Sequence, residues 1–405
     1  MSDNDEDYFD QMAESEEGQL DSSYQTEEDH LKVVSKNGRD LEFIDDQTEE
    51  ICLMAVRENS WALEYVKEQT EEICLEAVRK DGLVLRFVEN KTEEICLEAV
   101  RNDGRALRNV DENIFSKEVY QKLCWIGVGQ CWIALEYAKN QTMKLRLAAV
   151  ERCGHSLDYI DDQTDEICWV ALRECGSSLA YVKNQTYEMC VYALEKHGMN
   201  LRYVKNKTAD LCMMAVEKDG RALQFVENQT EELCLIAVRQ HSSYLRHVRD
   251  QTEEMCMIAV KKCGCALEYV REQTDNICLK AVKQNGHALR SVVNKTPQIC
   301  SEAVRQNGFA LAYVEDQTEE MCLEVVKDHG NMLEFVKDQT EEICLMAVRQ
   351  DSCALKHAKD QTEEICIAAF RRHDYASKYI RCEEMRQKIE NIRFLKTKAA
   401  SRKKC

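Results

Sequence analysis

Cysteine is the residue type whose number and spacing point most directly to chemistry in this chain. The 405 residues include 22 cysteines, and fourteen of them recur at one position of a repeated pattern. A ladder of thiols offers disulfide formation, metal binding or nucleophilic attack. The fourteen residues are Cys52, Cys74, Cys96, Cys124 and then every 22nd residue from Cys168 to Cys366.

The spacing argues against two of these uses. Stacked helices lie ~8–10 Å apart, whereas a disulfide needs Cα atoms roughly 4.4–6.8 Å apart. A zinc site is typically built from Cys-x-x-Cys pairs, but the only close pair here is Cys263-Gly-Cys265. We interpret the ladder as small core residues that let layers approach, with a redox or metal ladder as the alternative. So many thiols indicate a reducing, intracellular compartment, either cytoplasm or nucleus.

Other candidate chemistry is weaker. The recurrent acidic pairs, such as Glu49 and Glu50, are neighbours in a first helical turn, where they complement the helix dipole without forming a pocket. The nine histidines are scattered, and Gly127-Val-Gly129 is only a fragment of a phosphate loop. We therefore expect no enzyme, and no cofactor, metal or small-molecule substrate.

The elements that carry these residues repeat every 22 residues, and each begins with a threonine counted here as position 0. In the unit that starts at Thr70, apolar residues fall at positions 3, 4, 5, 7 and 8, which is helical spacing. Threonine is a good N-cap, and Gly82 at position 12 predicts a left-handed residue that ends the helix. The threonines are Thr26, Thr48, Thr70, Thr92 and then every 22nd residue from Thr142 to Thr362.

The second half of each unit is shorter. Leucine holds position 15 in fifteen units, and an aromatic residue usually holds position 17. These two positions alone would also suit a short strand, as in leucine-rich repeats, but alanine is common at position 14 and favours a helix of under two turns. The sequence predicts an all-α, elongated α-solenoid of about sixteen 22-residue helix–turn–helix repeats.

Charge and composition divide the chain into three parts, with a formal net charge of −20. Residues 1–25 hold nine acids and no base, which predicts a disordered acidic arm. Residues 26–380 form the α-solenoid. Residues 381–405 hold nine bases and three acids, which predicts a C-terminal capping helix and a basic tail. No apolar stretch predicts a secretory signal or a membrane span.

One unit, 111–141, breaks the pattern. Six extra residues shift the register, so that Tyr120 stands where threonine is expected, and the next positions include Trp125 and Trp132. The following unit has Lys144 in place of an acid and Arg146 in place of cysteine. These four residues, the two tryptophans, Lys144 and Arg146, are our candidates for a partner-binding spot or hinge. The alternative is drift of the repeat sequence, with local repacking around a large tryptophan.

The recurring run Gln-Thr-Glu-Glu-Ile-Cys-Leu-Glu-Ala-Val-Arg, followed by Asp/Asn-Gly-x-Ala-Leu-x-Tyr/Phe-Val, resembles a family of uncharacterised short repeats. The family is found in large DNA viruses of amoebae and in amoeba-associated microbes. The likeness covers about residues 26–380 and is strongest at 69–90, 229–250 and 339–360. The resemblance implies an all-helical array and a viral origin, and it implies no activity, substrate or cofactor.

A non-enzymatic scaffold that presents an extended solenoid surface to other proteins is the function that this pattern favours, with positions 6, 10, 13 and 16 as the variable surface. A structural component of a virion or other assembly is the alternative. A helical-repeat nucleic-acid reader is more distant, because the acidic array repels phosphates. We expect protein partners and no membrane.

Overall fold

The computed structural model describes residues 26–389 and 391 of the chain. The predicted acidic arm 1–25 and the predicted tail from 392 onward lie outside the described residues. Contacts divide the chain into two compact units, residues 1–193 and 194–405, with the boundary inside helix α9. Each unit is described by itself below.

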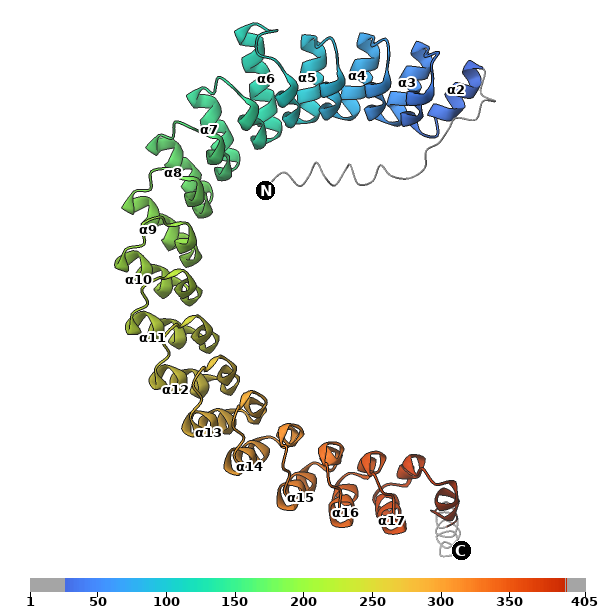
Figure 1. Cartoon of the computed structure of the whole chain (residues 1–405), viewed down its shortest axis with the longest axis vertical. Coiled ribbons are helices and arrows are strands. Elements are labelled where there is room, and N and C mark those ends of the chain that lie inside the picture. Colours follow the sequence, from blue (N-terminus) through green and yellow to red (C-terminus); the bar gives the residue numbers. More distant parts are fainter. Residues whose placement is uncertain (1–25, 390, 392–405) are drawn as a thin grey trace, which may run out of the picture. The chain divides into compact units, whose positions relative to one another are not determined.

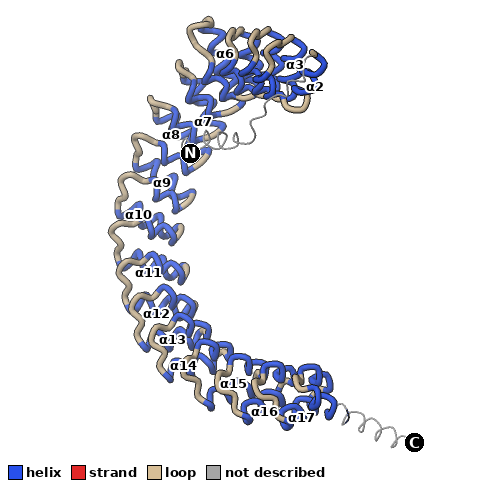
Figure 2. Tube along the Cα trace, turned by 45° about the vertical axis from the view of Figure 1, so that its right-hand side comes forward, coloured by secondary structure: helices blue, strands red, loops and turns tan. Residues whose placement is uncertain are grey.

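Both units consist of alternating α-helices and short 3₁₀ helices, and no strand occurs in the described part of the chain (Figures 1 and 2). The predicted all-α solenoid of 22-residue repeats is therefore confirmed. None of the described helices is both long and apolar enough to cross a membrane. The α-helices are α2 (Glu27–Val34), α3 (Glu49–Glu58), α4 (Glu71–Lys80), α5 (Glu93–Asn102), α6 (Lys117–Gln130), α7 (Met143–Arg152), α8 (Asp165–Glu174), α9 (Tyr187–Lys196), α10 (Ala209–Lys218), α11 (Glu231–Gln240), α12 (Glu253–Lys262), α13 (Asp275–Gln284), α14 (Pro297–Gln306), α15 (Glu319–Asp328), α16 (Glu341–Gln350) and α17 (Glu363–Arg372). The 3₁₀ helices are η1 (Gly38–Phe43), η2 (Ser60–Tyr65), η3 (Gly82–Phe87), η4 (Gly104–Asn109), η5 (Trp132–Tyr137), η6 (Gly154–Tyr159), η7 (Gly176–Tyr181), η8 (Gly198–Tyr203), η9 (Gly220–Phe225), η10 (Ser242–His247), η11 (Gly264–Tyr269), η12 (Gly286–Ser291), η13 (Gly308–Tyr313), η14 (Gly330–Phe335), η15 (Ser352–His357) and η16 (Asp374–Tyr379).

The first helix of each repeat starts where the threonine predicts. In α4 the hydroxyl of Thr70 accepts a hydrogen bond from the backbone N–H of Ile73 at 3.4 Å, which satisfies one orphan donor of the first turn. The same hydroxyl donates to the carboxylate of Glu49 in the preceding repeat at 2.9 Å. The threonine therefore both begins its own helix and ties it to the helix before.

The second helix is a 3₁₀ helix of six residues, which settles the choice between helix and strand. With three residues per turn, positions 12, 15 and 18 lie in one row. In the repeat of η3 these are Gly82, Leu85 and Val88, and all three are buried. The carboxylate of Asp81 caps this helix by accepting from the N–H of Leu83 at 2.9 Å. The period of three explains why leucine and valine recur at this spacing.

The glutamine that precedes each threonine joins successive repeats. The side-chain amide of Gln47 donates to the carbonyl oxygen of Leu41 in η1 at 3.3 Å and to that of Tyr65 in η2 at 2.9 Å. Its oxygen accepts from the N–H of Lys67 at 3.0 Å and from the thiol of Cys52 at 3.7 Å. One half-buried side chain thus links two 3₁₀ helices and one α-helix.

The recurrence of glycine at position 12 has a different cause from the one predicted. Gly82 does not adopt a left-handed conformation, so the predicted left-handed helix end is wrong. A Cβ atom on Gly82 would instead collide with the carbonyl oxygen of Ala99, at position 7 of the next repeat. We call this arrangement, glycine at position 12 against the carbonyl of position 7, a tight layer. Alanine occupies position 7 in thirteen of the sixteen repeats.

The irregular repeat keeps the linkage by another side chain. Helix α6 begins one turn early, with Ser116 as its N-cap, because the hydroxyl accepts from the N–H of Val119 at 3.4 Å. The buried phenol of Tyr120 donates to the carbonyl of Tyr137 at 3.3 Å and accepts from the N–H of Lys139 at 3.4 Å. These are the partners that the glutamine amide holds in the regular repeats.

Residues 383–389 are helical and follow η16. Ile389 is buried, and the guanidinium of Arg386 donates to the carbonyl of Ile380 at 2.6 Å. Lys388 also pairs with Glu363 of α17 at 2.5 Å. The segment packs on the last repeat, where a capping helix is predicted.

Candidate protein-binding surface

The cysteine ladder belongs to the core. All fourteen residues are buried, which confirms their predicted place. Burial raises the pKa of eight of the thiols to about 11, so they stay protonated at neutral pH, whereas the thiolate is the nucleophile and metal ligand. Within residues 26–389, no three His, Cys, Asp or Glu side chains are arranged to hold a metal ion.

The outer face of the α-helices differs between repeats while the core stays the same. At four junctions a base at position 9 pairs with an acid at position 6 of the next repeat. These pairs are Arg57–Glu76 at 3.0 Å, and Arg79–Glu98, Lys283–Glu302 and Arg305–Glu324 at 3.6 Å each.

In some repeats of each of the two compact units, an apolar residue takes the place of the acid at position 6. In the first unit, position 6 holds Ile126, Ala148, Val170 and Tyr192 on α6 to α9. In the second unit it holds Met214, Ile236 and Ile258 on α10 to α12. Every one of these side chains is partly exposed. The ring of Tyr192 also meets Trp169 edge-on, with 5.6 Å between ring centroids.

Helices α6 and α7 also reverse the sign of the charge at position 2. Fourteen repeats have an acid or an amide there, whereas α6 has Lys122 and α7 has Lys144. Lys122 pairs with Glu93 at 3.3 Å, and Lys144 is exposed. A positive charge near a helix N-terminus opposes the helix dipole. Lys144, in the first turn of α7, therefore does not serve helix stability, whereas Lys122 lies in the second turn of α6. Together the two lysines form a basic break in an edge of acids and amides.

Three of the four predicted site residues lie on α-helices, and the fourth lies on a 3₁₀ helix. Trp125 is on the outer face of α6 and is 44% exposed, one turn after Lys122. Lys144 and Arg146 are on α7, and the guanidinium of Arg146 donates to the carbonyl of Asp162 at 3.2 Å. Trp132 is the first residue of the 3₁₀ helix η5. No hydrogen bond, ion pair or ring contact joins any two of the four in the described structure.

Trp132 stands at position 12, where the tight layers have glycine. Its ring lies 5.9 Å from the ring of Tyr159, centroid to centroid. Because even a Cβ atom collides at this position in a tight layer, the junction of α6 and α7 cannot close as that of α4 and α5 does. The structure thus gives the irregular repeat a distinct junction.

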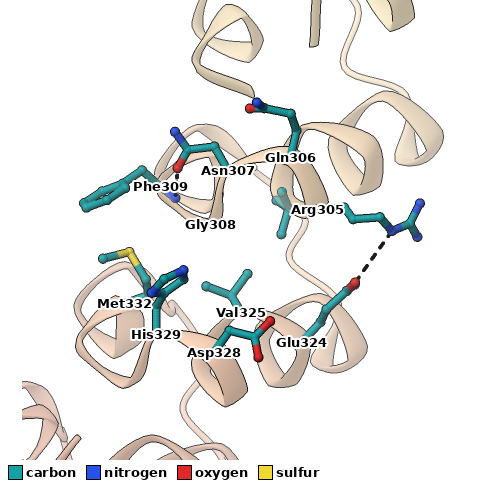
Figure 3. A pocket seen from close by; sticks show the side chains of 11 residues that line it. Arg305, Gln306, Asn307, Gly308, Phe309, Glu324, Val325, Asp328, His329 and Met332 are labelled. Atoms are coloured by element: carbon teal, nitrogen blue, oxygen red, sulfur yellow. Dashed lines mark hydrogen bonds and ion pairs between the residues drawn. The ribbon is translucent and has the colours of Figure 1, made fainter. Parts of the chain in front are cut away.

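Sequence reasoning missed a pocket between α14 and α15 (Figure 3). Position 7 of the α15 repeat is Val325 instead of alanine. The nearest atom to a Cβ built on Gly308 is Cγ1 of Val325 at 3.0 Å, and no backbone carbonyl lies within the first three neighbours. The extra methyl groups therefore hold the two repeats apart. The resulting cavity has a volume of about 270 Å³.

The pocket also lacks the polar bridge of other layers. Between α15 and α16, the Gln350 side chain accepts from the N–H of Gly330 and donates to the carbonyl of Asp328, both at 2.8 Å. The corresponding residue of α15 is Asp328, whose side chain is exposed and makes no hydrogen bond within the described residues. Its carboxylate has no donor for the carbonyls of α14.

The walls of the pocket combine charged and aromatic groups. Arg305 pairs with Glu302 at 2.6 Å and with Glu324 at 3.6 Å. Phe309 is 48% exposed at the edge of the pocket, and its ring stacks on His287 with centroids 6.2 Å apart. The one sequence signal for this pocket was the departure from alanine at position 7.

Comparison with known proteins gives a family without an assigned function. Residues 70–115, 252–296 and 318–362 are each similar to a family described as "Domain of unknown function (DUF4116)". Each match covers about two regular repeats, and one includes the pocket-forming α15. The region of α6 to α8 lies outside all three matches. No curated protein matches the chain.

Proposed function

We propose that this protein is a non-enzymatic scaffold that binds other proteins through the surface of its repeats. The observation that carries the proposal is the contrast between core and surface. Cysteine and alanine recur at buried positions, and threonine and glutamine recur in hydrogen bonds that join successive repeats, whereas the partly exposed position 6 ranges from glutamate to tyrosine. Repeat arrays that bind proteins vary their surface while they keep their stacking contacts.

The surface of α6 and α7 is the strongest candidate for a recognition spot. It combines an exposed tryptophan, Trp125, with neighbouring apolar residues and the basic residues Lys122 and Lys144. Buried aromatic anchors surrounded by charges dominate the energy of many protein interfaces. A partner with an acidic rim around an apolar side chain complements this surface.

The cellular setting of this scaffold is part of the proposal. The 21 described cysteines are all unpaired, which supports a reducing compartment inside a cell. The acidic edge of the repeats supports protein partners over nucleic acid, whose phosphates need bases.

The test is affinity purification of the full chain from cells, with quantitative mass spectrometry of what it retains. We expect specific partners that Trp125→Ala and Lys144→Glu each reduce at least tenfold. The matched control is Met54→Ala, which truncates an apolar residue of similar exposure at position 6 of the regular helix α3. Trp132→Ala and Arg146→Ala then ask whether the other two candidates contribute.

Two outcomes would contradict the proposal. Retention of no protein above the background of an unrelated array would remove the scaffold function. Self-association into large particles in sedimentation velocity, without other partners, would favour a structural component of a virion or other assembly.

A further inference from the structure

The side chain at position 10 can reach the end of the α-helix in the preceding repeat. The ammonium group of Lys80 in α4 donates to the last carbonyls of α3, those of Arg57 and Glu58. In α12, the ammonium of Lys262 donates to the carbonyls of Arg239 and Gln240, both at 2.8 Å. These carbonyls form the negative end of the helix dipole. In these two layers a lysine from one repeat therefore caps the helix before it.

The corresponding carbonyls at the pocket are those of Arg305 and Gln306, at the end of α14. No side chain of α15 donates to them in the described structure, because position 10 is Asp328. Arg305 and Gln306, which carry these carbonyls, both line the pocket that Val325 opens. The same place that holds an ammonium group in two other layers is thus open, with an acid at its side.

We infer that the pocket between α14 and α15 binds the ammonium group of a lysine side chain from a partner protein. The inference rests on the proposed scaffold function and assigns one part of its surface. The ammonium would donate to the carbonyls that end α14 and pair with the carboxylate of Asp328. The lining holds two carboxylates, from Glu324 and Asp328, and one guanidinium, from Arg305, so it favours a cation.

The size of the pocket fits one side chain. Its volume of about 270 Å³ lies below the range of ~300–1,000 Å³ typical of pockets for drug-sized ligands. The exposed face of Phe309 at the edge can cover the aliphatic stem of a lysine or attract its charge. Arg305 is held by Glu302 and Glu324, and leaves Asp328 to the incoming group.

Lysine is favoured over two other groups with hydrogen-bond donors. A carboxamide, as in Gln350, fits the carbonyls but gains nothing from the carboxylate of Asp328. A guanidinium matches a planar, forked acceptor best, whereas the helix-end carbonyls take the rotatable donors of an ammonium in the layers of Lys80 and Lys262.

The experiment measures saturation-transfer NMR from the full chain to Nα-acetyl-lysine N-methylamide. The matching norleucine amide has the same stem without the ammonium, and the glutamine amide tests the carboxamide. We expect transfer to the lysine probe, and weaker affinity by on the order of tenfold for the other two. Equal binding of the norleucine probe would overturn the inference.

Two variants of the chain locate the binding. Asp328→Gln supplies the bridge that Gln350 makes in the next layer, and Val325→Ala lets the layer close. We expect each to weaken the lysine probe on the order of tenfold. Circular dichroism checks that both remain folded. An unchanged affinity in both folded variants would place the probe elsewhere and sink the assignment.

A third variant is the matched control. Glu58→Gln changes an acid at position 10 where Gly38 packs against the carbonyl of Ala55 in a tight layer, and it should leave the lysine probe unaffected. The outcome separates this inference from the scaffold proposal. If partners are retained in cell extracts while the lysine probe fails to bind, the pocket assignment falls and the scaffold stands.

Discussion

The layer between α15 and α16 and the layer between α14 and α15 follow one 22-residue scheme with opposite results. In the former, Gly330 packs against the carbonyl of Ala347, and Gln350 bridges the helices. In the latter, Val325 and Asp328 take the places of the alanine and the glutamine, and a cavity of about 270 Å³ remains. Two side chains that face a neighbouring repeat therefore decide whether a layer closes.

The difference also shows how a repeat array can gain a pocket without an insertion. The backbone of α15 has the same length and N-cap as that of α16. His329 at position 11 makes no side-chain cap, and its ψ of 83° departs from the 113° of Asp351 in the next repeat. The local backbone adjusts to the wider spacing while the rest of the repeat keeps its contacts.

The largest contrast is expected from adding one methyl group to each glycine. Gly330→Ala should destabilise the chain by about 2–3 kcal/mol, because its Cβ would collide with a backbone carbonyl that cannot move alone. Gly308→Ala should cost less than about 1 kcal/mol, because only a side-chain methyl of Val325 must shift. Urea unfolding followed by circular dichroism measures both. Equal losses of unfolding free energy would mean that the repeats of α14 and α15 are packed as closely as those of α15 and α16.

Truncating adjacent valines of α15 should separate core packing from spacing. Val326→Ala removes a fully buried side chain and should cost about 2 kcal/mol. Val325→Ala removes as many atoms but lets the repeats approach, so we expect a cost below about 0.5 kcal/mol. The same urea experiment compares them, and a similar cost for both would show that the layer stays open without the valine.

The polar bridge should contribute less than the glycine contact. Gln350→Ala breaks two hydrogen bonds of 2.8 Å and should cost about 1–2 kcal/mol. Asp328→Ala removes an exposed side chain without hydrogen bonds and should leave stability unchanged within about 0.5 kcal/mol. Thermal unfolding of the two variants measures both stability losses. A larger loss of stability in Asp328→Ala than in Gln350→Ala would contradict the expected order.

The last comparison concerns the buried thiols of α15 and α16, Cys322 and Cys344, whose pKa values we expect to be the same. Burial raises the pKa of both Cys322 and Cys344 from 9.0 to about 11. A raised pKa in the folded state stabilises it below pH 9, and this contribution is lost as the pH rises through 11. The unfolding midpoint should therefore fall across this window.

Alkylation by iodoacetamide at pH 8, read by mass spectrometry, compares the two thiols directly. Cys322 and Cys344 should react at the same slow rate, and the exposed Cys175 should react faster. Faster reaction of Cys322 would show that the pocket admits solvent to the core.

Much of the fold could be predicted because its causes are local. Threonine at the start of a helix and the spacing of Ile73, Cys74, Ala77 and Val78 act within one helix, and they recur with one period. The candidate site was harder to predict. Trp125 and Lys144 stand out as departures from the repeat, whereas Val325 is an ordinary core residue by type, so nothing in its chemistry marks it as the wall of a pocket.

By itself, the amino-acid sequence determined the number of repeats, the start of the α-helix in the repeats that begin with threonine, and the residues of the core, because hydrogen bonds and apolar faces within about ten residues are enough to specify them. Only the tertiary structure decided the role of Gly82, the glutamine link of Gln47 and the opening beside Val325. Each of these depends on an atom in the neighbouring repeat, about 20 residues away, whose distance is set by how two helices pack.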